Sequence, residues 1–259
     1  MNTLVAQPAA VRQELDTQIS TAKAYPRSIA EFAKEAIAMV TIDQDTAESC
    51  IYALPRKSAN GSQSFLKGPS IRLAEIVASS WGNLHAATRI VENNGKTVKV
   101  EGVAWDLEKN LKIIKEVQRS ITNKEGRPFS QDMQIVTANA ASSIALRNAI
   151  LSVVPKALVN KVYEAAVNFA IGDQTQLSKK IQALFDRFQK MGIGKEKILA
   201  YFQRKDASEV TVEDVEEMIG IGTSIKEKNV SIDDAFDLEK KNNNEQTSAL
   251  NDKLSGEIS

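Results

Sequence analysis

Cysteine, histidine and long apolar runs are nearly absent from this chain, and each shortage excludes a class of protein. Cys50 is the only cysteine among 259 residues, so no disulfide can form within the chain, which fits a reducing compartment. No apolar run approaches the ~18 residues of a membrane span. The first ten residues lack a basic segment before an apolar stretch, so a secretory signal is not expected. We therefore expect a cytoplasmic protein.

The residues needed for catalysis are also scarce. His85 is the only histidine, and catalytic triads or two-histidine metal sites need a histidine beside other groups. Cys50 lies beside an apolar stretch, which favours a buried thiol over a nucleophile. Asp106 and Glu108 would need further partners to hold a metal. Without such a constellation, we expect neither an enzyme nor a metal site.

Nucleotide-binding motifs are missing as well. Neither GxxxxGK[ST] nor GxGxxG occurs. The run Gly192-Ile193-Gly194-Lys195 lacks the first glycine of a phosphate loop, so it is interpreted as a turn between two helices. We expect no cofactor.

The charge of the chain is zero overall but unevenly distributed. Residues 1–49 carry −3, residues 50–161 carry +8, residues 162–172 carry −1 and residues 173–259 carry −4. A basic middle between acidic ends indicates a polyanionic partner, and it also favours attraction between copies of the chain. The alternative is that a modest excess of positive charge only solvates the surface.

Helical periodicity and capping signals predict the N-terminal elements. A first helix covers residues 11–23 and ends before Pro26, because proline removes a backbone donor. Ser28 is a suitable N-cap for a second helix, with Glu31 at the capping-box position. A short helix is predicted within residues 43–50.

The next segment, residues 56–69, is rich in glycine, serine and basic residues, so its composition predicts a loop. A helix follows, with Pro69 or Ser70 at its start and Gly82 after its end. Three strands are then predicted at residues 84–91, 97–107 and 111–121. The turn Asn93-Asn94-Gly95 is typical of a hairpin, so the three strands form an antiparallel meander.

A long helix is predicted over residues 129–154, capped by Ser130 and ended by Pro155. Its small residues would let it lie close to a sheet or to another helix. Another helix covers residues 156–170, and a linker is placed at residues 172–175. Shorter helices follow at residues 177–191, at residues 195–202 and after Thr211, which has Asp214 three positions on.

Together these elements predict an α+β fold. An antiparallel β-meander packs with helices, including one long helix, and a small all-α C-terminal module and a disordered tail follow. The predicted domains are an α+β core (1–172), an acidic helical module (173–237) and the tail (238–259).

Basic residues mark three candidate DNA-binding elements. The first is the predicted loop and the following helix N-terminus, where backbone amides attract phosphate; its residues are Arg56, Lys57, Lys67 and Arg72. The second is the meander, where Lys115 and Arg119 share one strand face and would line a groove with Lys99. Its full set of residues is Lys99, Lys112, Lys115, Arg119, Lys124 and Arg127.

The third candidate element is a polar stripe on the long helix, formed by Asn139, Ser143 and Arg147 at a spacing of four residues. This stripe would face DNA, a neighbouring subunit or water. The candidate base contacts are Tyr52, Phe65 and Trp105. Aromatic residues make up only 5% of the chain, so a stacking-rich platform is not expected, and Trp105 alternatively belongs to the core.

The order of elements resembles the phage single-strand annealing recombination proteins of the RecT, Redβ and Erf groups. The resemblance rests on helices, a meander and a long helix with the sequence SSIALRNAILSVVPKALV, in which Arg147 to Pro155 matches a basic residue in an apolar run ending at proline. A small helical domain after a linker, residues 177–236, matches the RecT-type arrangement. The segment GPSIRLAEIVASSWGNL is also similar to phage-encoded relatives.

This resemblance implies a DNA recombination protein that binds single-stranded DNA and anneals complementary strands without ATP, as homo-oligomeric rings or filaments. It also implies partners for the C-terminal module, such as a single-strand-binding protein or an exonuclease. The alternative is a non-enzymatic oligomeric phage assembly or anti-defence protein that binds an acidic protein partner.

Overall fold

The computed structural model describes residues 9–57, 63–123, 125–173, 175–227 and 230–236. The predicted tail, residues 238–259, therefore lies outside the described residues. The chain divides into two compact units, which we call unit 1 (Met1–Met39 and Ala74–Val162) and unit 2 (Val40–Leu73 and Tyr163–Ser259). The predicted boundary at Gly172 does not coincide with this division, because residues 40–73 pack with the C-terminal part of the chain.

The helices predicted before the linker at residues 172–175 are present. Their bounds are α1 Ala9–Ala24, α2 Ile29–Val40, α3 Gln44–Ser49, α4 Ile71–Trp81, α5 Gln131–Val153 and α6 Lys156–Ile171. Ser130 caps α5, since its side chain accepts a hydrogen bond from the Met133 backbone. Asp43 caps α3 in the same way through Thr46. The capping signal at Ser130 therefore identified the start of α5 correctly, and the helix predicted to begin at Asp43 is confirmed.

Unit 1 is built around the predicted antiparallel meander. Its strands are β3 Leu84–Asn93, β4 Thr97–Asp106 and β5 Leu111–Ser120, in the order β3-β4-β5. Gly95 in the first turn has a φ of 77°, a conformation that glycine adopts without strain. The α+β class and the meander are thus confirmed.

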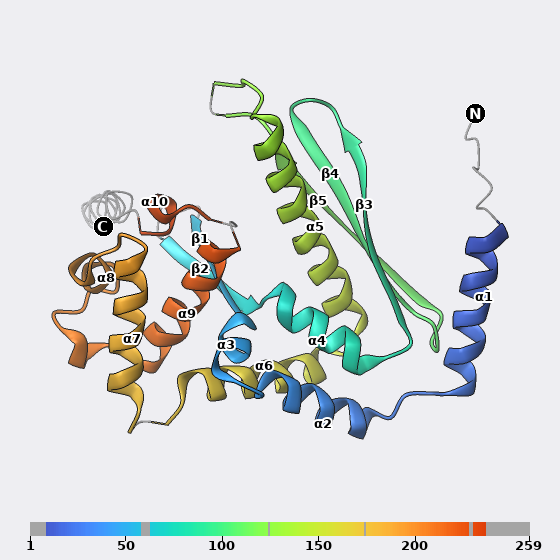
Figure 1. Ribbon diagram of the computed structural model, residues 1–259, viewed down its shortest axis with the longest axis horizontal. Helices are drawn as coiled ribbons and strands as arrows, with labels where there is room; N and C mark the ends of the chain where they lie inside the picture. The colour runs from blue at the N-terminus through green and yellow to red at the C-terminus, as the bar shows by residue number, and fades with distance from the viewer. Residues whose placement is uncertain (1–8, 58–62, 124, 174, 228–229, 237–259) are drawn as a thin grey trace, which may run out of the picture. The chain divides into compact units, whose positions relative to one another are not determined.

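The long helix α5 covers one face of this sheet (Figure 1). Alternate β4 residues, among them Val98 and Val100, are buried with Ala141 and Ala145 of the helix. The approach is closest at Gly102, where an added Cβ would lie 2.2 Å from the carbonyl carbon of Ala145. The small residues of α5 therefore allow close packing on the sheet, which is one of the two partners that the sequence left open.

An ion-pair cluster joins the segment before α2 to the end of β4. Arg27 donates from Nη1 and Nη2 to the Asp106 carboxylate at 2.5 and 2.7 Å, and from Nε to Glu108 at 3.0 Å. The Trp81 indole donates to Asp106 at 3.2 Å, and the Arg27 guanidinium lies 4.3 Å from the Trp81 ring centroid. Burial alone would raise the pKa of Asp106, but these donors outweigh it and the pKa is lowered. Asp106 and Glu108 thus act as structural partners of an arginine.

Unit 2 contains the main correction to the predicted fold. Residues 56–69, predicted to be a loop, belong largely to a hairpin of β1 Ile51–Lys57 and β2 Gln63–Pro69. The helices of this unit are α7 Leu177–Lys190, α8 Lys195–Tyr201, α9 Val212–Lys226 and α10 Ile232–Ala235, with a 3-10 turn at Ala207–Glu209. Glycine and serine dominated the compositional signal, but packing against α9 stabilises the strand conformation.

Helix α9 lies directly on β1 (Figure 1). At Gly220 an added Cβ would be 2.7 Å from both the backbone nitrogen and the Cβ of Ala53. Ile51 and Ala53 are fully buried in a core with Phe188 of α7. The capping box predicted at the start of α9 is confirmed, with reciprocal bonds between Thr211 and Asp214. The helices of unit 2 therefore share their core with a β-hairpin.

Within the described residues, no single helix is long and apolar enough to cross a membrane. Only α5 and α6 taken together pass the length and composition test, and they are bent by 119° where they meet.

Candidate nucleic-acid interface

The three cations predicted on β5 do not all point to one side of the sheet. Lys115 is paired with Gly102 and Arg119 with Val98, so both lie on the face that α5 covers. Lys112 is paired with Trp105 and lies on the opposite face, which we call the open face. Because side chains alternate along a strand, this separation follows directly from the register.

The predicted groove that combined Lys99 with Lys115 and Arg119 is wrong. Lys99 is paired with Gln118, which places it on the open face, away from the other two cations. Its ammonium also forms an ion pair with Glu116 at 2.7 Å. The hydrogen bond to Glu116 raises the pKa of Lys99, so this cation is already partnered.

The open face as a whole is balanced in charge. Arg89 pairs with Glu101 at 2.6 Å, beside the pair formed by Lys99 and Glu116. Salt bridges at an exposed surface contribute little to stability, but they reduce the positive field that the face presents to a polyanion. The open face is therefore not a continuous basic track.

The free edge of β5 is different. The strand lies at one end of the sheet, and Lys112 and Lys115 are exposed while Arg119 is half-buried. Among the described residues, neither Lys115 nor Arg119 forms an ion pair or a hydrogen bond through its side chain. Arg127, in the segment after β5, is also exposed. We call Lys112, Lys115 and Arg119 the β5-edge row. It is a set of cations available to an external anion.

The candidate clamp at the start of α4 lies in unit 2. Lys67 on β2 forms an ion pair with Glu216 of α9 at 3.0 Å. Arg72 is exposed in the first turn of α4. The side chains of Arg56 and Lys57 lie outside the described residues, as does Lys124 of unit 1. Of the clamp's four predicted cations, only Lys67 and Arg72 have described side chains, and Lys67 is bound to a carboxylate.

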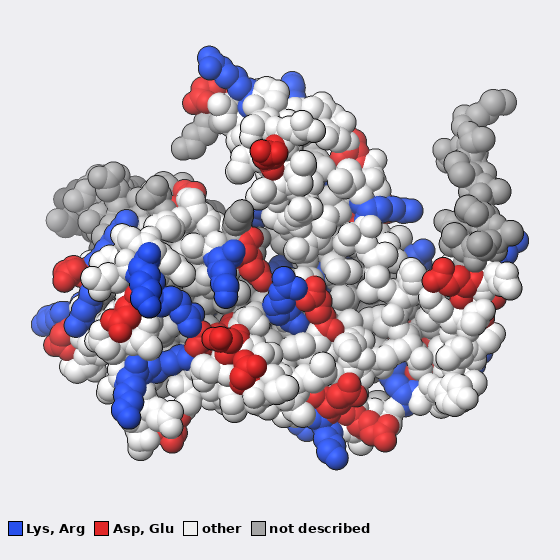
Figure 2. Space-filling model, viewed as in Figure 1, with Lys and Arg blue, Asp and Glu red and all other residues white. Residues whose placement is uncertain are grey.

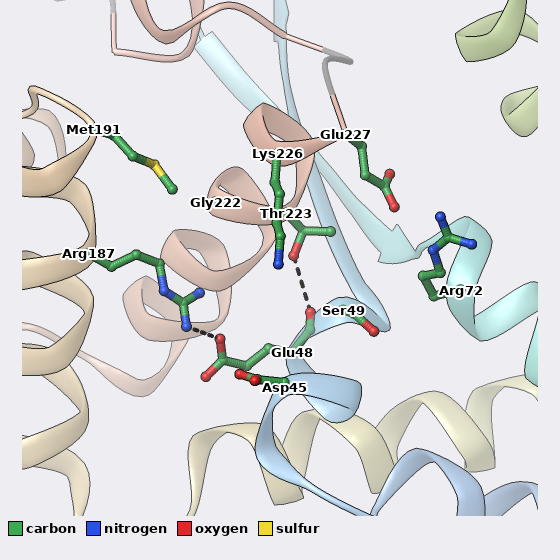
Figure 3. Close-up of a pocket in the computed structure, with 10 residues that line it drawn as sticks. All are labelled: Asp45, Glu48, Ser49, Arg72, Arg187, Met191, Gly222, Thr223, Lys226 and Glu227. Carbon is green, nitrogen blue, oxygen red and sulfur yellow. Dashed lines mark hydrogen bonds and ion pairs between the residues drawn. The ribbon is translucent and has the colours of Figure 1, made fainter.

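Arg72 lines a pocket of about 640 Å³ in unit 2. Figure 3 shows Arg72, Arg187 and Lys226 around this pocket, together with Asp45, Glu48 and Glu227. The cations and carboxylates of the lining are equal in number. Figure 2 shows the same interleaving of opposite charges over the C-terminal helices on the face it presents. This pocket has no excess charge to select a polyanion.

Glu48 is the centre of the pocket's ion pairs. Its carboxylate is 5% exposed and binds Lys180 and Arg187, while the Thr223 hydroxyl donates to the Glu48 carbonyl at 3.2 Å. Burial alone would raise the pKa of Glu48, but the hydrogen bonds from Lys180 and Arg187 outweigh it and the pKa is lowered. These contacts join α3, α7 and α9, so the cluster stabilises the unit.

The polar stripe of α5 is turned away from the sheet. Asn139, Ser143 and Arg147 lie about 160° to 240° around the helix from Ala141, which packs on the sheet. Asn139 is exposed, and the other two are half-buried. The Arg147 guanidinium contacts the Asn148 side chain at 3.3 Å. The stripe therefore does not join the open face.

Of the three candidate base contacts, only Trp105 has an accessible side chain in the described residues. Tyr52 is 5% exposed, which contradicts its prediction as a base contact. The side chain of Phe65 lies outside the described residues. Trp105 is half-buried on the open face, and its Nε1 donates to Asn110 at 3.2 Å.

Sequence reasoning missed two residues beside Trp105. His85 and Arg89 line a second pocket, in unit 1, with Trp105 and Lys112. The alternation of His85, Ala87 and Arg89 along β3 could have placed these residues on one face of the sheet. The pairing of β3 with β4, however, could not be predicted from the sequence. Pairing counted back from Asn93 and Val98 would place His85 opposite Asp106. A bulge between Ile90 and Glu92 shifts the register by one residue, so His85 is paired with Trp105.

Nucleophilic and metal chemistry find little support in the described residues. Cys50 is fully buried, and burial raises the pKa of its thiol to about 12, which disfavours the reactive thiolate. No group of three or more histidine, cysteine, aspartate or glutamate residues in the described part of the chain is placed to hold a metal ion.

Comparison with known proteins gives no family for this chain. No protein-family model matches it, and neither a curated protein nor a solved structure does. The resemblance to single-strand annealing proteins therefore stays a prediction from the sequence.

Proposed function

We propose that this chain binds single-stranded DNA and anneals complementary strands without ATP. The β5-edge row carries the proposal, since its cations lie on an edge strand and form no ion pair with a carboxylate among the described residues. Neutralising phosphates with Lys and Arg releases counterions and dominates sequence-independent binding. A strand held by its backbone along the edge keeps its base edges free to pair.

The distribution of charge between the units supports this assignment. Unit 1 has 16 Lys and Arg against 12 Asp and Glu, whereas unit 2 has 17 against 21. A polyanion is therefore attracted to unit 1 and repelled by unit 2. In this proposal, many subunits in the cytoplasm of a bacterial host present one long strand. The C-terminal residues bind a protein partner such as a single-strand-binding protein or an exonuclease.

A second function uses the same edge. Leu111 and Ile114 of β5 are 45% and 47% exposed, and an unpaired strand edge can receive an extended segment of another protein by strand addition. An acidic segment would then pair with the β5-edge row. This alternative corresponds to a non-enzymatic assembly or anti-defence protein.

A double variant separates these functions. We expect Lys115→Ala/Arg119→Ala to bind a fluorescent single-stranded oligonucleotide more weakly, with the slope of log K against log salt reduced by about 1.4, since each phosphate contact to a single strand contributes about 0.7. The matched control, Lys179→Ala/Lys190→Ala, removes two exposed cations from α7 of unit 2 and leaves the slope unchanged.

Circular dichroism checks that both double variants are folded, and titration at two salt concentrations gives the slope. Unchanged affinity and slope in the β5 variant would exclude the β5-edge row as the DNA site. If the wild-type chain binds no oligonucleotide at either salt concentration, the protein-binding alternative is favoured.

A further inference from the structure

The open face of unit 1 carries a pocket of about 240 Å³ around Trp105. Three strands contribute to it: His85 and Arg89 from β3, Trp105 from β4 and Lys112 from β5. Helix α1, which lies on the opposite side of the sheet from α5 (Figure 1), adds Glu14 and Leu15. The lining of the pocket thus combines an aromatic ring, two cations and two residues of α1.

The chemistry of this lining fits a flat ring attached to an anion. The lining includes two cations, Arg89 and Lys112, and one carboxylate, Glu14. Arg89 is bound to Glu101, yet its side chain is still 65% exposed, so it can contact a second anion. Leu15 is half-buried and supplies an apolar surface. A nucleotide combines a ring that stacks on aromatic side chains with a phosphate that binds cations.

A hydrogen bond fixes the orientation of the Trp105 indole in the pocket. Its Nε1 is bound to Asn110, which orients the indole while leaving the ring to line the pocket. The Lys112 ammonium is 5.7 Å from the ring centroid, close to the ~6 Å limit for a cation–π contact. Lys112 is therefore weakly held at the ring and can move to a phosphate.

We propose that this pocket receives one unstacked base of a single strand, with Trp105 as the stacking surface. Lys112 lies on the open face, whereas Lys115 and Arg119 lie on the other face of β5. A strand bound to the β5-edge row therefore crosses the edge of the sheet and reaches the pocket at Lys112. This inference rests on the proposed function and adds the site at which one base leaves the strand.

Tryptophan fluorescence tests the pocket directly. The chain has two tryptophans, and Trp81 is 5% exposed and lies against Arg27. We expect a 20-nucleotide oligothymidine to quench the emission of the wild-type protein. An abasic oligonucleotide of the same length still binds through its phosphates but causes no such quenching. In Trp105→Phe the quenching is lost, while affinity for oligothymidine stays within a few-fold of wild type.

Affinity gives the second readout. Trp105→Ala is expected to weaken oligothymidine binding about 5- to 150-fold, the equivalent of one base stacked on an aromatic ring. It leaves the affinity for the abasic oligonucleotide and the salt slope unchanged. Gln118→Ala is the matched control, because Gln118 lies on the same face but outside the pocket.

The outcomes of these experiments distinguish failure of the pocket proposal from failure of the β5-edge row as the DNA site. Two outcomes would contradict the pocket proposal but not the β5-edge row. One is that Trp105→Ala binds oligothymidine with wild-type affinity, and the other is that quenching persists in Trp105→Phe. Equal wild-type affinity for the two oligonucleotides also overturns the pocket proposal. If the wild-type chain binds neither oligonucleotide, the proposed function fails and the pocket fails with it. The phenylalanine variant keeps the test decisive should the alanine variant not fold.

Discussion

Each unit packs a helix against a β-strand at a glycine, but the two units place the glycine on opposite partners. In unit 1 the strand provides Gly102 and the helix provides Ala145, whereas in unit 2 the helix provides Gly220 and the strand provides Ala53. The requirement is the same in both, because two backbones can approach this closely only where one side chain is absent. Either partner can supply the missing side chain.

The units differ more in how they use their cations. In unit 2, Lys180, Arg187 and Lys67 are bound to carboxylates within the unit. In unit 1, Arg89 and Lys99 of the open face are paired too, but Lys112, Lys115 and Arg119 on β5 form no ion pair among the residues described. Cations held by internal carboxylates stabilise a fold, and cations without such partners are available to a ligand. Unit 2 also has exposed cations, such as Lys179 and Lys190, but its net charge is negative, so the DNA site is proposed in unit 1.

The largest expected effect comes from filling the closest helix–strand contact. Gly102→Ala places a Cβ against the backbone of Ala145, which cannot rotate away, so we expect a loss of about 3 kcal/mol in the free energy of unfolding. Gly220→Ala is expected to cost less, because its added Cβ is 2.7 Å from its neighbours and alanine favours a helix by roughly 1 kcal/mol.

Urea denaturation followed by circular dichroism measures both changes. Gly68→Ala is the control, since nothing lies within 4 Å of its added Cβ. Equal stability of Gly102→Ala and Gly68→Ala would contradict the packing argument.

An intermediate effect is expected from the buried carboxylate of unit 2. Glu48→Gln removes the charge that Lys180 and Arg187 bind, and we expect a loss of about 2–3 kcal/mol at pH 7. This is below the 3–5 kcal/mol typical of a broken buried pair, because Arg187 is 38% exposed. Urea denaturation of the variant and of the wild type at pH 7 gives the difference.

The same substitution predicts a pH dependence. Folding lowers the pKa of Glu48 below its ordinary value of 4.5. Its contribution is therefore complete above that value and is lost as the pH falls through the folded pKa. The stability difference between wild type and Glu48→Gln should shrink on acidification, and a difference that grows instead would contradict the lowered pKa.

The smallest effect is expected at the ion pair between β2 and α9. Lys67 pairs with Glu216, but its side chain is one-third exposed, and exposed pairs typically contribute less than about 1 kcal/mol. We expect Lys67→Met to change the free energy of unfolding by about 0.5 kcal/mol. A loss comparable with that of Glu48→Gln would show that this pair contributes as much as the buried cluster.

Much of the fold was predictable because its signals are local. Ser130, Asp43 and Thr211 mark helix starts through side chains that bond to the backbone two or three residues on, and Asn94-Gly95 marks the first turn of the meander. The β1–β2 hairpin was not predictable in this way. Its strands are stabilised by α9, more than 140 residues later in the chain, and no local pattern records that contact.

The candidate site was predictable only in part. Lys112, Lys115, Arg119 and Trp105 were identified by residue type and by position on predicted strands. Their grouping was wrong, because the side of the sheet on which Lys99 lies depends on its pairing with Gln118 rather than Arg119. One residue of register reverses the face of every side chain on a strand.

The sequence by itself determined the helices, the meander and the concentration of positive charge in the middle of the chain, since these follow from periodicity, capping and composition. Tertiary structure alone decided which of those charges face one another. The β3 bulge places His85 beside Trp105, and the β4–β5 register separates Lys99 from Lys115 and Arg119. The physical reason is that strand pairing is set by contacts between distant segments, and it assigns each side chain to one face of the sheet or the other.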